Sequence, residues 1–278
     1  NGSWQYSTDG TTWAAFRAVS SSNALLLTST TQVRYIPDGS NGETATFGFV
    51  AWDQTAGTAS TNATPSYANP GAGGGTTAYS SQSATTSLTV TSVNDAPTIT
   101  NAATVTLTTT DENTPSSGTT VNTILTGASW ADVDTGALKG IAVTSVTGNG
   151  SWQYSTDGVT WAAFGAVSSS NALLITSTTQ VRYIPDGSNG ETATFGFVAW
   201  DQTTGTPSSN ATPSYANPGA GGGATAYSSQ SATASLTVTS VNDAPTITNA
   251  ATVTLTTTNE NTTSSATTVN TIVTGASW

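Results

Sequence analysis

Short runs of alternating apolar and polar residues recur along the chain, separated by turn-forming residues. In residues 44–53, Phe47 and Phe49 fall on one face of an extended strand, and Val50 and Trp52 fall on the other. This period of two is typical of β-strands. The same reasoning predicts strands at residues 24–28, 32–36, 44–53, 79–93, 104–108 and 141–146, and a further strand that contains Val121, Ile124 and Leu125.

Turn signals place these strands in an all-β fold. The dipeptide Asp9-Gly10 predicts a hairpin whose first strand carries Trp4 and Tyr6 on one face. No run has a convincing helical period, and many short strands with regular turns indicate a β-sandwich. Residues 54–78 have no apolar pattern, so we expect a functional loop or an ordered lateral contact there.

The chain repeats itself after 148 residues. Asn1 aligns with Asn149 and Trp130 aligns with Trp278, and the copies differ at 12 of 130 aligned positions. A repeat of this length is a whole domain rather than one turn of a solenoid. The stretch 92–99 (Ser-Val-Asn-Asp-Ala-Pro-Thr-Ile) returns unchanged at 240–247. Its proline stiffens the backbone, so we interpret it as the joint between tandem domains, arranged end to end.

The phase of the repeat divides the chain into three parts. Residues 1–98 are the C-terminal part of one repeat domain, 99–246 are a complete domain, and 247–278 are the N-terminal strands of the next domain. We expect the two partial pieces to make one domain together. Residues 1–98 alone would expose strand edges. We therefore predict either a longer array or copies of the chain that join head to tail into a filament.

Composition narrows the function. Four basic residues face fifteen acidic ones, for a net charge of −11. This charge excludes nucleic acid as a partner and favours cations. No apolar run is long enough to span a membrane, so no membrane insertion is expected. The chain has no Cys and no His, and nearly all of its carboxylates lie in turns, so we expect no enzyme.

Three acidic motifs accompany the joint: Asn94-Asp95, Asp111-Glu112-Asn113-Thr114 and Asp132-x-Asp134. Together with the Val-Asn-Asp-Ala-Pro joint, they resemble the bacterial cadherin-like and VCBS-type tandem repeats of large surface adhesins. The resemblance extends over the whole chain. It implies Ig-like or cadherin-like β-sandwiches, an extracellular or cell-surface location, and Ca²⁺ bound near the joint.

Hard cations take six to eight oxygen ligands. Carried over by position, the resemblance implies ligands in both copies, and the alternative is that these side chains only cap turns. Asn259 replaces Asp111 in the second copy. The candidate metal ligands are Asn94, Asp95, Glu112, Asp132, Asp134, Asp53, Asp201, Asn242, Asp243 and Glu260.

The resulting functional hypothesis is a structural extracellular repeat protein, a stalk or filament in adhesion or biofilm matrix. The alternative is a module that binds a glycan or a cell surface through the 54–78 loop or exposed Trp side chains. Core packing is the competing explanation for the Trp residues, since they occupy alternating strand faces. A further alternative is an isopeptide bond between Lys139 and a nearby Asn or Asp.

Overall fold

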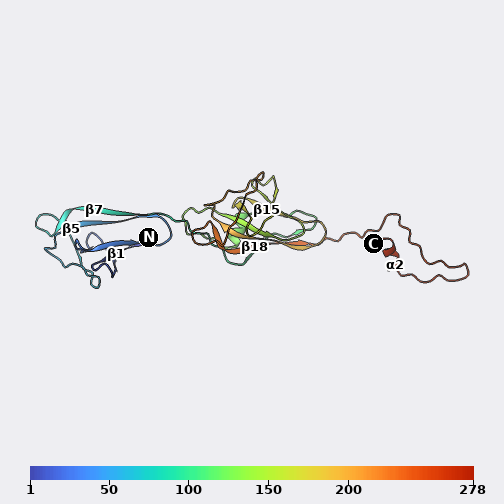
Figure 1. The fold of residues 1–278 in the computed structure, drawn as a ribbon, viewed down its shortest axis with the longest axis horizontal. Coiled ribbons are helices and arrows are strands. Elements are labelled where there is room, and N and C mark those ends of the chain that lie inside the picture. Colours follow the sequence, from blue (N-terminus) through green and yellow to red (C-terminus); the bar gives the residue numbers. More distant parts are fainter.

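The computed structural model describes all 278 residues, which form two β-rich units and a C-terminal segment in a row (Figure 1). Twenty elements are present, of which eighteen are strands and two are seven-residue helices. The prediction of an all-β chain is therefore confirmed. No helix is long and apolar enough to cross a membrane.

The second unit contains a seven-stranded and a four-stranded sheet. In the larger sheet the order is β17-β14-β11-β16-β18-β8, and β9 also pairs with β18. Only β8 and β9 run parallel to their neighbour. The larger sheet comprises β8 (Ala103–Thr106), β9 (Thr110–Asp111), β11 (Gly140–Val146), β14 (Ala172–Thr176), β16 (Glu191–Trp200), β17 (Tyr215–Ala216) and β18 (Tyr227–Thr239). The smaller sheet comprises β10 (Thr119–Thr120), β12 (Ser151–Ser155), β13 (Ala162–Ala163) and β15 (Gln180–Ile184), in the order β10-β15-β12-β13.

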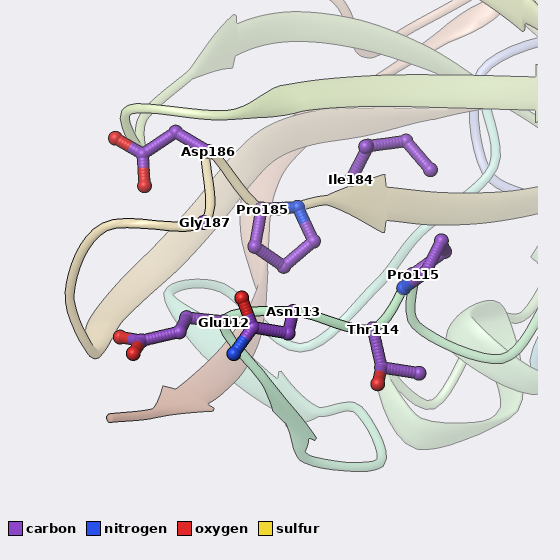
Figure 2. Close-up of a pocket in the computed structure, with 8 residues that line it drawn as sticks. All are labelled: Glu112, Asn113, Thr114, Pro115, Ile184, Pro185, Asp186 and Gly187. Atoms are coloured by element: carbon purple, nitrogen blue, oxygen red, sulfur yellow. The ribbon is translucent and has the colours of Figure 1, made fainter. Parts of the chain in front are cut away.

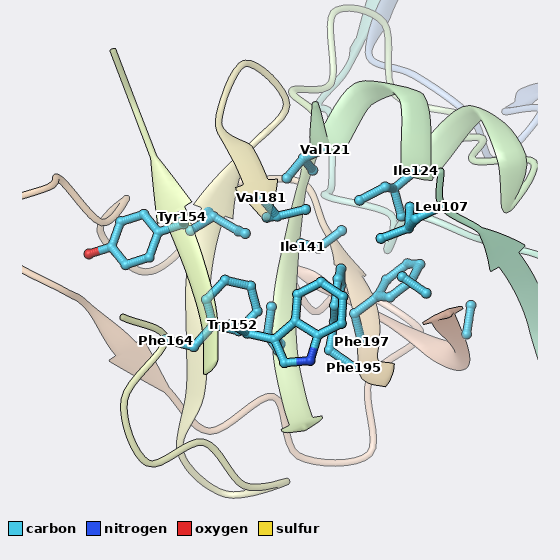
Figure 3. Packing of buried hydrophobic residues seen from close by; sticks show 14 of the residues in the cluster. Leu107, Val121, Ile124, Ile141, Trp152, Tyr154, Phe164, Val181, Phe195 and Phe197 are labelled. Carbon is cyan, nitrogen blue, oxygen red and sulfur yellow. The ribbon is translucent and has the colours of Figure 1, made fainter. Parts of the chain in front are cut away.

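The core of this unit lies between the two sheets (Figure 3). A cluster of 23 buried residues takes Trp152 and Tyr154 from the smaller sheet and Ile141, Phe195 and Phe197 from the larger one. The opposite face of β16 belongs to a second cluster, which contains Trp200. The predicted alternation along this strand is thus confirmed, and the larger sheet is covered in part on both faces.

The strand β11 holds the larger sheet together. It is hydrogen-bonded to β14 on one side and to β16 on the other. Within it, Ile141 is paired with Ile175 across one boundary and with Ala199 across the other. The strand β11, which precedes the opening hairpin of the unit, therefore lies between two strands that follow the hairpin.

The prediction of a strand around Val121 is wrong, because these residues form the helix α1 (Val121–Gly127). The Thr120 side chain caps its first turn by accepting a hydrogen bond from the Thr123 amide at 3.2 Å. Val121, Ile124 and Leu125 are all fully buried. Their spacing of three and four residues is that of one helix face, and tertiary burial of this face stabilises so short a helix.

The first unit has the same strands after its hairpin but lacks a counterpart of β11. As a result its strands form three separate sheets, β2-β1-β4, β3-β6 and β5-β7, instead of two. These strands are β1 (Ser3–Ser7), β2 (Ala14–Ala15), β3 (Ala24–Leu25), β4 (Gln32–Ile36), β5 (Glu43–Trp52), β6 (Tyr67–Ala68) and β7 (Tyr79–Val90).

The first unit has no counterparts of residues 99–148, which supply much of the core of the second unit, and this leaves apolar side chains of the first unit exposed. Phe49 is 49% exposed, whereas its counterpart Phe197 is 0% exposed. Leu88 is 41% exposed, and its counterpart Leu236 is 1% exposed. The local sequences are nearly the same, so the difference comes from the absent residues and not from these strands.

The C-terminal segment, residues 247–278, carries the helix α2 (Val269–Gly275) and no strand. In the second unit β8 and β9 pair with β18, but in this chain the corresponding residues of the C-terminal segment have no such strand to pair with. Val269 is accordingly 73% exposed, whereas its counterpart Val121 is buried. The expectation that the two partial pieces make one domain needs correction. Residues 247–278 correspond to 99–130, so the two pieces together still lack 131–148, and with them β11.

The 54–78 loop and its counterpart are ordered, and each contains a two-residue strand that the sequence pattern did not reveal. Tyr215 in β17 pairs with Leu173 in β14, and its hydroxyl donates to the Phe164 carbonyl at 2.9 Å. The glycine run packs against β18: a Cβ on Gly221 would lie 2.2 Å from the Ser228 carbonyl oxygen. These glycines allow a close backbone approach, so the loop is a lateral covering of the sheet.

The opening hairpin follows the prediction from Asp-Gly, since β1 pairs with β2 and β12 with β13. In its turn, one Asp157 carboxylate oxygen accepts hydrogen bonds from the amides of Val159 and Thr160. These bonds lower the pKa of Asp157 far below its usual range. This aspartate therefore has a structural role.

Candidate cation-binding joint

The joint between the two units is bonded directly to the second unit. The Asn94 side-chain amide donates to the Asp201 carboxylate at 2.9 Å and to the Thr225 carbonyl at 3.1 Å. The Ala96 amide donates to the Gly223 carbonyl at 2.8 Å. The joint is thus attached to the end of β16 and to the glycine-rich loop, and it is no free linker.

The same joint positions the acidic turn that follows α1. Thr98 and Ala131 form an isolated antiparallel bridge with amide-to-carbonyl distances of 2.7 and 2.9 Å. This bridge places Asp132 and Asp134 beside the joint. The Asp95 amide donates to Asp134 Oδ2 at 2.7 Å, and the Asp134 amide donates to Asp132 Oδ1 at 2.9 Å.

Negative charge is concentrated here, and none of these carboxylates forms a salt bridge. Burial raises the pKa of Asp132, and the carboxylates of Asp134, Asp201 and Asp95 raise it further. Asp132 Oδ2 and Asp134 Oδ1 are buried and have no hydrogen-bond partner. Asp201 is 2% exposed and in contact with the joint through Asn94, whereas its counterpart Asp53 is exposed and has no such contact.

The structure therefore brings together Asn94, Asp95, Asp132, Asp134 and Asp201, but it places Glu112 elsewhere. Glu112 accepts a hydrogen bond from the Val241 amide at 2.8 Å, at the end of β18 that leads into the second joint. The ten residues of β16 separate the two ends of the unit by about 33 Å at about 3.3 Å per residue. Glu112 thus belongs with the following joint.

The end of the second unit that leads into the second joint carries a shallow depression (Figure 2). Glu112 is 1% exposed, and its Oε2 atom has no hydrogen-bond partner. The side chains of Asn113 and Asp186 lie along the same depression, which eight residues line: Glu112, Asn113, Thr114, Pro115, Ile184, Pro185, Asp186 and Gly187.

The remaining predicted ligands have no neighbouring unit within this chain. Asp53 has no unit before it, and Asn242, Asp243 and Glu260 have no complete unit after them. Asp53 bonds only to Thr55, from which one of its oxygens accepts two hydrogen bonds. The Asn242 side chain donates to the neighbouring Asp243 carbonyl at 3.3 Å. Asp243 and Glu260 are both exposed.

All the donors of this set are oxygens, and some of them are buried without hydrogen-bond partners. Oxygens are the ligands that a hard cation such as Ca²⁺ prefers. As they stand, no three of the acidic side chains are close enough together to hold a metal ion. A cation would offset the repulsion among the four aspartates of the joint.

In the second unit, the Trp residues that could have formed a sugar-stacking surface are packed against other side chains. In the second unit Trp152 is 4% exposed and Trp200 is 0% exposed. The Trp161 ring is covered by Arg182, whose guanidinium carbon lies 4.1 Å from the ring centre. Lys139, the candidate for an isopeptide bond, instead lies with its Nζ 4.7 Å from the centre of the Trp130 ring.

Comparison with known proteins gives little further information. No protein-family model and no curated protein matches the chain. Among solved structures, the chain is similar to an endo-fucoidan hydrolase, MfFcnA4, from glycoside hydrolase family 107. The TM-score is 0.28 at 13% identity, and the match covers 79% of this chain but 22% of the enzyme. A likeness this weak carries no argument about fold or activity.

Sequence reasoning found the carboxylates of the joint but missed the groups that orient them. The carbonyls of Thr225 and Gly223 come from a loop that had no apolar pattern. The Asn41 side chain of the first unit also reaches the acidic turn. Backbone groups leave no mark in a sequence, and Asn41 lies in an ordinary turn.

Asn94→Ala should destabilise the second unit, because it leaves one oxygen of the buried Asp201 without its partner. We expect a loss of about 1–3 kcal/mol in urea unfolding of the full chain. Asn242→Ala is the matched control, since Asn242 has no partner in a following unit. Equal unfolding free energies for the two variants would show that the joint is not docked as described.

Proposed function

We propose that the chain is part of a structural, extracellular repeat protein that forms a stalk or filament at a bacterial surface, in adhesion or in a biofilm matrix. Its units would be cadherin-like β-sandwiches that carry no active site and act as spacers. The observation that supports this best is the joint, since Asn94, Asp95 and Ala96 of one unit's exit are hydrogen-bonded to the next unit. Because the joint is hydrogen-bonded to the next unit, the orientation of one unit constrains the orientation of the next.

The first unit lacks a counterpart of β11, and an adjoining repeat of the same polypeptide can supply this strand better than a separate chain can. A second chain that offered its residues 247–278 would bring counterparts of β8, β9, β10 and α1, but none of β11. The gap between β3 and β5 would stay open. A preceding repeat in the same polypeptide supplies all of residues 99–148 and closes the gap. Head-to-tail contact is therefore proposed between repeats rather than between chains.

The joint would bind Ca²⁺ and be stiffened by it. Asp95, Asp132, Asp134 and Asp201, with the Asn94 side chain, would hold the ion from the following unit's side. A residue equivalent to Glu112 would contribute from the preceding unit. The buried, unpartnered oxygens of Asp132 and Asp134 support this proposal.

The stalk function is tested with arrays of two, four and six complete repeats in solution scattering. A stiff stalk gains the same length with every added pair, whereas a flexibly linked chain grows roughly with the square root of repeat number. We expect linear growth. Arrays in which Asn94, Asp95 and their counterparts are replaced by Gly serve as the control, and square-root growth of the native array would contradict the proposal.

Calcium should raise the melting temperature of the chain relative to EDTA. For a dissociation constant of about 1 mM and about 10 mM Ca²⁺, linkage gives about 1.4 kcal/mol of added stability. Asp201→Asn should abolish this gain, whereas Asp53→Asn, at the same position of the unit without a preceding joint, should leave it intact. Identical melting curves of the unsubstituted chain in calcium and EDTA would rule out the cation.

A further inference from the structure

The first unit touches the second at a place other than the joint. The Asn41 side-chain amide donates to the Val133 carbonyl at 3.0 Å, and its carbonyl oxygen accepts from the Thr135 amide at 2.8 Å. These two backbone groups flank Asp134. A single side chain thus holds the acidic turn on both sides of the aspartate that binds the Asp95 amide.

Asn41 is itself fixed to the first unit. It belongs to the turn that joins β4 to β5, in which the Asp38 carboxylate accepts from the Ser40 amide at 3.1 Å. The next residue, Gly42, lies close to the start of the joint, because a Cβ added to it would be 2.7 Å from the Ser92 amide nitrogen. The turn is therefore held both to the strands of the first unit and against the start of the joint.

The second copy of this turn shows the same residues without a partner. Asn189 occupies the equivalent position before Gly190, is exposed, and makes no side-chain hydrogen bond. The counterparts of Val133 and Thr135 would be residues 281 and 283, past the last residue of this chain. Asn41 and Asn189 thus form a natural pair, one in contact with a following unit and one free.

We propose that Asn41 is a clamp between successive units, which sets the angle between them and positions the acidic turn. The joint is hydrogen-bonded to the second unit, but it is connected to the first unit by a single chain, about which the first unit can turn. A second contact, away from that axis, removes this freedom, since two hydrogen bonds at one side chain fix both distance and direction. The partner of the clamp is the exposed backbone of the acidic turn in the next repeat.

The clamp also bears on cation binding, and this part rests on the proposed function. By holding the backbone on both sides of Asp134, Asn41 keeps the Asp134 carboxylate on the Asp95 amide and the Asp134 amide on the Asp132 carboxylate. A cation at the joint and the clamp would then stabilise the same arrangement of the two units. Each would strengthen the other by the same factor.

The clamp is tested by measuring the distance between the units in the full chain. The chain has no cysteine, so Ser22→Cys and Ser170→Cys, both at exposed sites, allow one spin label in each unit. We expect pulsed EPR to give a narrow distance distribution for the parent and for Asn189→Ala, and a clearly broader one for Asn41→Ala. Equal widths for the two Ala variants would overturn the proposal.

A calcium titration of the same three proteins separates the two proposals. If both hold, Asn41→Ala weakens the apparent calcium affinity about fivefold or more, while Asn189→Ala does not change it. If calcium binds none of them but Asn41→Ala still broadens the distribution, the clamp stands and the cation is refuted. If calcium binds all three with equal affinity, the coupling between clamp and cation is refuted.

Discussion

The strand β11 is the constraint on which each unit depends. It lies between β14 and β16, and it unites strands that come later in the chain into one seven-stranded sheet. The first unit, which lacks β11, keeps its hairpins but divides into three small sheets. It also lacks the counterparts of α1 and of residues 99–107, and Phe49 is exposed where Phe197 is buried. The apolar faces of a unit are buried only when residues from before and after its opening hairpin come together.

The docked joint follows from the same arrangement. β11 enters the sheet just after the acidic turn. The segment from the joint through α1 to β11 therefore sets the position of each unit relative to the unit before it. Buried oxygens of Asp132 and Asp134 lie at this boundary without partners, and the burial of carboxylates there costs free energy. Both the proposed cation and the Asn41 contact act on this turn. Each unit boundary therefore combines backbone docking, charge and a side-chain clamp.

The sequence predicted much of this, for identifiable reasons. Strands with a clear period of two, such as β5 and β16, and the Asp-Gly hairpins follow from local chemistry. The helix α1 was missed because three apolar residues were assigned to a strand although their spacing fits a helix face. The placement of Glu112 at the opposite end from Asn94 depends on the parallel pairing of β9 with β18, which no local pattern encodes. The central position of β11 is equally non-local. The expectation that two partial pieces complete a unit overlooked residues 131–148, which contain this strand.

Amide hydrogen exchange in β5 tests the central role of β11 most directly. The chain would be extended before residue 1 by a copy of residues 99–148, or by a copy of 99–130 alone. Peptides that reach residue 56 or 204 distinguish β5 from the identical β16, because these positions are Ala and Thr. We predict that the longer extension slows exchange in β5 to the level of β16, while the shorter one leaves it fast. Exchange in β5 that is already as slow as in β16, or that the shorter extension slows as well, would contradict the account.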